Sequence, residues 1–183
     1  MENLLAKICY NKKQEINENK KKYSYKTLEK LLNNAKTKRG FKNKIVKAQQ
    51  DKKNCIIGEI KKSSPSAGNI IKEYYPEEIA LIYEKAGIGA ISVLTDKKFF
   101  DGQLDHLSIV KKTTNIPILR KDFIIDEYQI LESKVYNADA ILLILSILTD
   151  DKVKNFIKIA EEFNLDCIIE THDEEEVQRA IKI

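Results

Sequence analysis

Short apolar runs alternate with amphipathic segments over most of this chain, and this alternation constrains its fold more than any other feature. From residue 55 onward, runs typical of buried β-strands occupy 56–60, 90–94, 116–119, 140–144 and 166–170. Segments with the apolar spacing of helices occupy 76–87, 104–112, 126–136, 149–163 and the stretch from 173 onward. Near-continuous apolar strands between amphipathic helices predict a parallel sheet that is buried on both faces.

Apolar stripes and capping residues indicate where these helices face and begin. The segment 76–87 has a stripe predicted to face the sheet, made up of Ile79, Ile82, Tyr83 and Ala86. The segment 149–163 has a second stripe, made up of Val153, Phe156, Ile157 and Ala160. Asp126 stands three residues before Gln129, which is the spacing of a capping box and predicts a helix start.

Two closures are common for such a sheet, the (β/α)8 barrel and the open doubly wound sheet. No GxGxxG pattern follows any predicted strand, which disfavours a dinucleotide-binding fold. Charged residues at the carboxyl ends of the first, third and fifth strands favour the barrel, where catalysis takes place at that rim. We therefore predict an α/β protein of the (β/α)8 barrel class. Residues 1–53 would form a helical extension, and residues 54–183 a partial barrel truncated after five βα units.

Charge is distributed unevenly along the chain. Residues 1–53 contain 16 Lys and Arg against 5 Asp and Glu, whereas residues 54–183 contain 16 against 23. A basic N-terminal arm is compatible with nucleic-acid binding. The acids are interspersed, however, and aromatic or glycine-rich RNA signals are missing, so we predict a solvated helical extension and no nucleic-acid partner.

The cysteines, the histidines and the hydropathy indicate where the protein is located and whether it binds a metal or a membrane. Cys9, Cys55 and Cys167 form no CxxC pair, which is typical of reduced thiols and predicts a cytoplasmic protein. The only histidines, His106 and His172, disfavour a histidine-based zinc site, so no metal is expected. No stretch resembles a signal peptide or reaches transmembrane length, so no membrane partner is expected.

Four charged residues stand where predicted strands end. Glu59 and Lys61 share one face at the end of the first strand, because alternate residues of a strand point the same way. Lys121 follows the third strand and Glu170 ends the fifth. A lysine beside other charges can serve as an acid and a glutamate as a base, while a second lysine can bind an anion. The alternative is that these residues form salt bridges at the rim.

Two loops near the same rim add candidate substrate contacts. The loop 64–68, Ser-Pro-Ser-Ala-Gly, offers hydroxyl groups that could contact a phosphate or could cap their own turn. Phe99 and Phe100 follow the second strand. Such aromatic residues usually belong to a core, but beside this rim they could stack on an aromatic substrate.

Several segments together make the chain resemble the indole-3-glycerol phosphate synthase family of (β/α)8 enzymes. They are IIGEIKKSSPSAG (56–68), AISVLTDKKFFDGQ (90–103), PILRKDFIIDEYQI (117–130), ADAILLI (138–144) and CIIETHDEEEV (167–177). The N-terminal helices also resemble the extension of that family, so the resemblance covers essentially the whole chain.

The resemblance implies a carboxy-lyase of tryptophan biosynthesis that needs no metal or organic cofactor. Its phosphorylated substrate, 1-(2-carboxyphenylamino)-1-deoxyribulose 5-phosphate, would be converted to indole-3-glycerol phosphate by ring closure and loss of carbon dioxide and water. By resemblance, Lys121 would be the general acid and Glu170 the partner acid or base in dehydration. Lys61 would bind the anthranilate carboxylate, and Glu59 would orient the lysines.

The same resemblance implies the binding residues. Ser64 would contact the phosphate from a substrate-binding loop that also contains Pro65 and Ser66. Phe100 would line the aromatic pocket.

A whole barrel of this kind takes about 250 residues. The family's sixth to eighth strands, which supply further catalytic groups and most of the phosphate cradle, have no counterpart in these 183 residues. We therefore expect this chain alone to have little activity, and the expected partner is a fused or complementing C-terminal segment.

Other functions remain compatible with the pattern. One is another phosphate-binding barrel enzyme, such as the neighbouring isomerase of the pathway or an aldolase that forms a Schiff base with Lys121. Another is a non-catalytic fragment or interaction protein on the same fold, with a basic arm.

Overall fold

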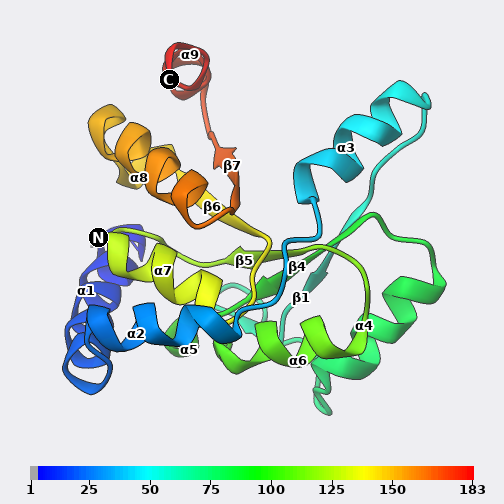
Figure 1. The fold of residues 1–183 in the computed structure, drawn as a ribbon, viewed down its shortest axis with the longest axis horizontal. Helices are drawn as coiled ribbons and strands as arrows, with labels where there is room; N and C mark the ends of the chain where they lie inside the picture. The colour runs from blue at the N-terminus through cyan, green and yellow to red at the C-terminus, as the bar shows by residue number, and fades with distance from the viewer. Residues whose placement is uncertain (1–3) are drawn as a thin grey trace.

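The computed structural model describes residues 4–183, and a parallel sheet lies at its centre (Figure 1). Its strands are β1 (Ile57–Ile60), β4 (Ala90–Leu94), β5 (Ile118–Lys121), β6 (Ala140–Ile144) and β7 (Asp166–Glu170). They pair in the order β1-β4-β5-β6-β7, and each pair is parallel. The strand order follows the chain without a reversal, so the predicted barrel-type α/β fold is confirmed and the doubly wound alternative is wrong.

Helices follow the strands as the sequence predicted. They are α4 (Pro76–Lys85), α6 (Asp105–Thr113), α7 (Glu127–Val135), α8 (Asp150–Glu162) and α9 (Glu174–Lys182). Shorter elements lie between them: the hairpin of β2 (Ser63–Ser64) and β3 (Gly68–Asn69), the single turn α5 (Lys97–Phe100) and the 3-10 turn η2 (Leu145–Ile147). The capping box predicted at Asp126 is present, because its carboxylate accepts from the Tyr128 amide and the Gln129 side chain accepts from the Asp126 amide.

The stripe predicted for α4 is partly wrong. Ile82 is 63% exposed and Ala86 is also exposed, whereas Pro76 and Ala80 are buried. Ile79 and Tyr83 pack against the core as predicted. In the described part of the chain α4 packs beside α6 and its other flank faces solvent, so only a narrow stripe is buried.

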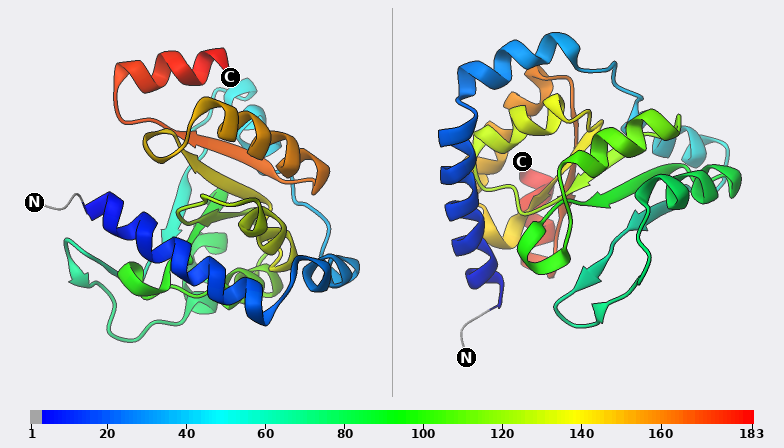
Figure 2. Two further views of the ribbon diagram at one scale, coloured as in Figure 1. Left: turned by 90° about the vertical axis from the view of Figure 1, so that its left-hand side faces the viewer. Right: turned by 90° about the horizontal axis from the view of Figure 1, so that it is seen from below.

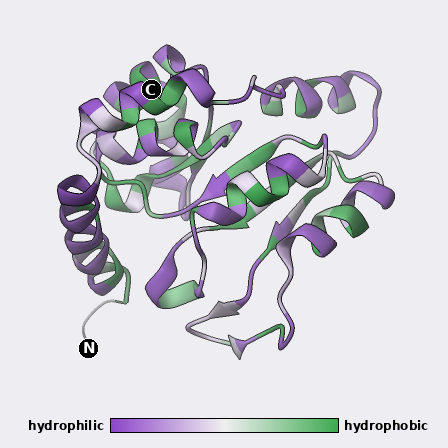
Figure 3. Cartoon of the chain, turned by 60° about the horizontal axis from the view of Figure 1, so that its bottom comes forward, coloured by the Kyte–Doolittle hydropathy of each residue, from purple (hydrophilic) through white to green (hydrophobic). Residues whose placement is uncertain are grey.

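The strands of the sheet contain much of the hydrophobic sequence (green in Figure 3), and their apolar side chains pack on both faces of the sheet. The face that packs on the helices is formed by alternate strand residues, among them Ile60, Ile91, Val93, Ile118, Ile141 and Leu143. The opposite face, here called the inner face, has a second cluster of Ala90, Leu119, Ala140, Leu142 and Ile144. Because strand side chains alternate, each polar residue at a strand end can be assigned to one of these faces.

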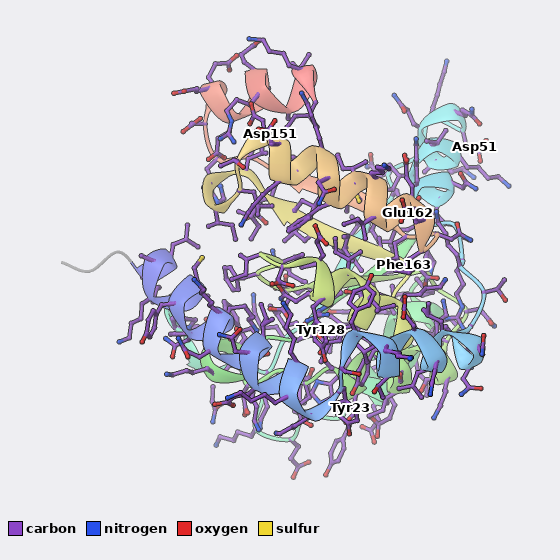
Figure 4. The ribbon with its side chains drawn as sticks, turned by 60° about the vertical axis from the view of Figure 1, so that its left-hand side comes forward. Tyr23, Asp51, Tyr128, Asp151, Glu162 and Phe163 are labelled. Atoms are coloured by element: carbon purple, nitrogen blue, oxygen red, sulfur yellow. The ribbon has the colours of Figure 1, made fainter. Side chains whose placement is uncertain are left out.

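The N-terminal helices run along the sheet from one end to the other (Figures 1 and 2). They are α1 (Leu4–Lys22), α2 (Tyr25–Leu31), η1 (Leu32–Asn34) and α3 (Phe41–Gln50). Helix α1 lies against the loops that follow β4 and β5, and α2 packs on α7. At the corner between α1 and α2, the Tyr128 hydroxyl donates to the Tyr23 carbonyl at 3.0 Å (Figure 4).

At the amino ends of the strands, the extension is held by a buried carboxylate. The Asp139 carboxylate accepts from the Arg39 amide at 2.7 Å, from Lys111 Nζ at 2.5 Å and from the Ile118 amide at 2.8 Å. Phe41 then packs into the inner-face cluster. The division of the chain at residues 53 and 54 stays a prediction. No helix between residues 4 and 183 combines the length and the hydropathy needed to cross a membrane.

Candidate active site

Glu59 and Lys61 form an ion pair at the carboxyl end of β1. The Lys61 ammonium lies 2.5 Å from Glu59 Oε1, and about a third of each side chain is exposed. The neighbouring residues of β1 show on which face of the sheet Glu59 and Lys61 lie. Ile60 packs among the helix-side residues, and a Cβ on Gly58 would lie 2.7 Å from the Tyr83 ring of α4. Glu59 and Lys61 alternate with these residues and therefore lie on the inner face.

Lys121 and Glu170 form a second ion pair on the same face. Lys121 ends β5 two residues after inner-face Leu119, and Glu170 ends β7 two residues after Ile168, which packs against the inner-face cluster. Their side chains meet above β6, with 3.4 Å between Lys121 Nζ and Glu170 Oε2. The inner face thus has two ammonium groups and two carboxylates at the carboxyl ends of three strands.

Arg120 and Asp122, which flank Lys121, belong to the other face. The predicted third strand ends at residue 119, but β5 extends two residues further, so Arg120 lies inside the strand. Its guanidinium is buried and contacts Asp122 at 2.9 Å and Glu132 of α7 at 3.0 Å. Burial raises the pKa of Glu132, and the Arg120 guanidinium opposes that shift. Arg120 therefore anchors β5 to α7. Lys121, the last residue of the strand, lies on the opposite face.

His172 was not predicted as part of the site. Its Nε2 lies 3.3 Å from Glu170 Oε1, and its Nδ1 lies 3.5 Å from Glu176 of α9. The only signal in the sequence is that His172 follows Glu170 by two residues, beside the helix cap at Asp173. Glu170 therefore has Lys121 on one side and an imidazole on the other.

Phe100 faces a second aromatic ring across the loops that follow β4 and β5. Its ring centroid lies 6.1 Å from that of Phe123, which packs against the inner-face cluster. Phe123 was not singled out from the sequence, although it directly follows Asp122 in the motif 117–130. The two rings form an aromatic wall beside the carboxyl ends of the strands.

Ser64 ends β2, and Pro65 and Ser66 lie in the turn of the β2–β3 hairpin. The Ser64 hydroxyl accepts from the Ala67 amide at 3.1 Å and lies 3.3 Å from the Ser66 hydroxyl. Pro65 and Ser66 are exposed. The hairpin leaves β1 directly after the Glu59–Lys61 pair, but its hydroxyls bond within their own turn. A role for these residues in phosphate binding stays a prediction.

The groups at this face can carry out acid–base chemistry. Ammonium groups can donate protons or bind carboxylates, and carboxylates can accept protons or orient the ammonium groups. Among residues 4–183, no cluster of three or more histidine, cysteine and acidic side chains has the arrangement of a metal site.

Comparisons with known proteins agree on one family. The sequence profile of "Indole-3-glycerol phosphate synthase" matches residues 5–183. A protein of that name from Caldanaerobacter subterraneus is 49% identical over 180 residues, covering 98% of this chain and 67% of the relative. Proteins of the same name from Thermoanaerobacter pseudethanolicus and Prochlorococcus marinus are each 44% identical, and the chain covers 66% and 61% of their lengths. The chain thus spans about two thirds or less of these relatives.

Solved structures with a similar fold have much lower sequence identity. Tryptophan synthase subunit alpha from Legionella pneumophila matches with a TM-score of 0.51 and 14% identity, over 79% of this chain and 63% of the other. A methylornithine synthase matches with a TM-score of 0.50 and 14% identity, over 86% and 59%. At this identity the likeness shows the fold alone.

Proposed function

This chain belongs to the indole-3-glycerol phosphate synthase family, and from that premise we propose that its inner face takes part in indole-3-glycerol phosphate synthesis for tryptophan. The substrate would be 1-(2-carboxyphenylamino)-1-deoxyribulose 5-phosphate. The observation that carries the proposal is the pair of inner-face ion pairs, Glu59–Lys61 and Lys121–Glu170. Together they provide an acid, a base and a cation for the substrate carboxylate at one end of the sheet.

In the first step, the ring carbon that bears the carboxylate attacks the substrate's ketone carbon. A carbon–carbon bond forms, and the carbonyl electron pair moves to oxygen. Lys121 donates its proton to that oxygen, which becomes a hydroxyl group. The carboxylate then leaves as carbon dioxide, and its bonding electrons restore the aromatic ring.

In the second step, the new hydroxyl group leaves as water. This elimination needs an acid at the oxygen and a base for the proton that is lost. Lys121, which regains a proton from solvent after the first step, is proposed as the acid at the leaving oxygen, and Glu170, 3.4 Å from Lys121, is proposed as the base for the C–H proton. One carbon dioxide and one water leave, and no oxidant or reductant is required.

The remaining residues would bind and orient the substrate. Lys61 would bind the anthranilate carboxylate, and Glu59 would hold Lys61 in place through the contact already present. The Phe100–Phe123 wall would contact the aromatic ring. The Ser64 hydroxyl would turn from its own loop toward the phosphate.

We further propose that these 183 residues act together with a fused or complementing C-terminal segment. β1 and β7 each have one neighbour in the described sheet, so each leaves an edge available for pairing. A phosphate site in such barrels usually comes from the loops after strands seven and eight. We also propose a cytoplasmic location, which the free thiols of Cys9, Cys55 and Cys167 support.

The test is formation of indole-3-glycerol phosphate from the synthetic substrate. The chain is assayed alone and together with the C-terminal third of the Caldanaerobacter relative, added as a separate polypeptide or fused after Ile183. Product is expected with the added segment and little without it. Absence of product in every form would refute the activity, and robust product from the monomeric chain alone would refute the need for a second segment. Borohydride trapping of a Lys121–substrate adduct would support an aldolase instead.

A further inference from the structure

Lys12 of α1 is a buried cation at the carboxyl ends of the strands. The side chain has no exposed surface, and its ammonium lies 2.9 Å from Asp96 Oδ2 and 3.0 Å from Asp122 Oδ1. Both carboxylates are also buried, and they follow different strands, β4 and β5. Lys12 therefore joins two loops that have no sequence proximity to each other or to α1.

Each of these two carboxylates holds one side of the aromatic wall. Asp96 caps α5, since its carboxylate accepts from the Phe99 amide at 2.8 Å, and α5 ends at Phe100. Asp122 accepts from the Phe123 amide at 2.8 Å. Lys12 thus links the backbone segments that carry the two facing rings.

The two sides depend on Lys12 to different degrees. The Asp122 carboxylate also accepts from Thr95 at 2.7 Å and from Arg120 at 2.9 Å, so it stays anchored without Lys12. Within residues 4–183, the contacts of the Asp96 carboxylate are those to Lys12 and to the Phe99 amide of its own turn. Asp96 is therefore the carboxylate that depends on Lys12 for a contact outside its own turn, although α5 is also bonded to α1 through Lys98 and Asn11.

Lys12 remains charged in this buried position. Burial lowers the pKa of Lys12, but the carboxylates of Asp122, Asp96 and Glu15 outweigh that effect, and the resulting pKa is raised. An ammonium group held by two buried carboxylates has few alternative positions, because any movement leaves one of them unpaired.

We propose that Lys12 is a positioning residue that sets the place of Phe100 in the aromatic wall and thereby the affinity for the aromatic part of the substrate. This inference rests on the proposed function for the identity of that substrate. It assigns α1 a role in substrate affinity, although α1 supplies no group to the reaction.

The decisive variant is the double substitution Lys12→Met with Asp96→Asn. It removes one positive and one negative charge together, and Asp122 keeps Arg120 as its partner. Glu15, which also pairs with Lys12, is about a third exposed and can be solvated, and the asparagine can still cap α5. The control is Lys20→Met, which breaks another ion pair between α1 and the barrel. Lys20 lies 2.8 Å from Asp126, the N-cap of α7, in a pair that is 41% and 35% exposed and includes neither Asp96 nor Asp122.

Kinetics provide the first readout, in whichever form of the protein forms product. The double variant should raise KM about tenfold and change kcat much less. A tenfold loss of affinity is the size expected for the loss of one aromatic contact. Lys20→Met should stay within about twofold of the parent. On a Phe100→Ala background, the double substitution should have almost no further effect, because both changes remove the same contact. A well-folded double variant with the parent's KM would overturn the proposal, as would additive effects on KM.

Amide hydrogen exchange provides a second readout that needs no activity. In the 183-residue chain, the Phe99 amide should exchange about tenfold faster or more in the double variant, with Lys20→Met unchanged. Faster exchange in a protein that forms no product would uphold Lys12 as the clamp of α5 and refute the proposed function. Unchanged exchange at Phe99 would overturn the clamp, whatever the activity.

Discussion

Lys121 Nζ lies 3.4 Å from Glu170 Oε2, although the strands that end at these residues are separated by β6. The two side chains can meet across β6 because both lie on the inner face at the carboxyl end of the sheet. About a third of each side chain is exposed, so this pair contributes little to stability by itself. In the proposed function, this contact places the proton donor Lys121 beside the proton acceptor Glu170.

Replacing Lys121 should affect turnover far more than binding. A general acid acts mainly in the transition state, so Lys121→Ala should lower kcat about 10²- to 10⁴-fold and leave KM within about threefold. Steady-state kinetics with the synthetic substrate measure both. The control is Lys154→Ala on the exposed face of α8, which should behave like the parent. Near-normal turnover in Lys121→Ala would rule out its role as the acid.

Replacing Lys61 should affect substrate binding more than turnover. If Lys61 binds the substrate carboxylate in the ground state, Lys61→Met should raise KM about tenfold or more with a smaller change in kcat. The adjacent Lys62 is a matched control, because it pairs with Asp101 outside the inner face. An equal rise in KM for Lys62→Met would show that general positive charge, rather than Lys61 itself, binds the substrate.

The fold was largely predictable because its signals are local. The strands 90–94, 140–144 and 166–170 have the predicted bounds, and the capping box at Asp126 begins α7. The errors occur where tertiary contacts determine the burial of a residue or the end of a strand. Ile82 is exposed because no element within residues 4–183 covers that flank of α4. β5 continues through Arg120 because its guanidinium has buried partners on α7.

The candidate site was predictable only where its residues follow strands directly. Alternation within a strand placed Glu59 and Lys61 on one face, and the ends of the third and fifth strands supplied Lys121 and Glu170. Lys12 could not be found in this way, because its partners Asp96 and Asp122 are distant in sequence and a lysine in a basic helix looks solvated. Only the packing of α1 on the rim distinguishes Lys12 from the other lysines of the extension.

Acid should destabilise the protein partly through Asp122. Burial raises the pKa of Asp122, but Lys12, Arg120 and Thr95 outweigh burial and hold that pKa well below its usual range. A depressed pKa contributes stability that is present above the unfolded value, about 3.9, and is lost as the pH falls toward the folded value. Urea unfolding should therefore show a steep loss of stability below about pH 4. Asp122→Asn should flatten that loss and should also be less stable at pH 7. An unchanged pH dependence in Asp122→Asn would exclude this carboxylate as a source of acid sensitivity.

At the other end of the sheet, Asp139 should support stability without affecting chemistry. Its carboxylate joins the extension at Arg39, helix α6 at Lys111 and strand β5 at Ile118. The Lys111 side chain is almost fully buried, and burial lowers its pKa against the opposing effect of Asp139. Asp139→Asn would leave that ammonium without its counter-charge, so the free energy of unfolding should fall by about 3 kcal/mol or more.

The measurement is urea unfolding at pH 7, with Asp151→Asn on the exposed first turn of α8 as the control. The double variant Asp139→Asn with Lys111→Met removes both charges and should recover a large part of the loss. In an active form of the protein, KM and kcat of Asp139→Asn should match those of the parent at a temperature where both are folded, because Asp139 lies at the amino ends of the strands, opposite the candidate site. A large fall in kcat with full folding would mean that this end of the sheet is coupled to the catalytic end.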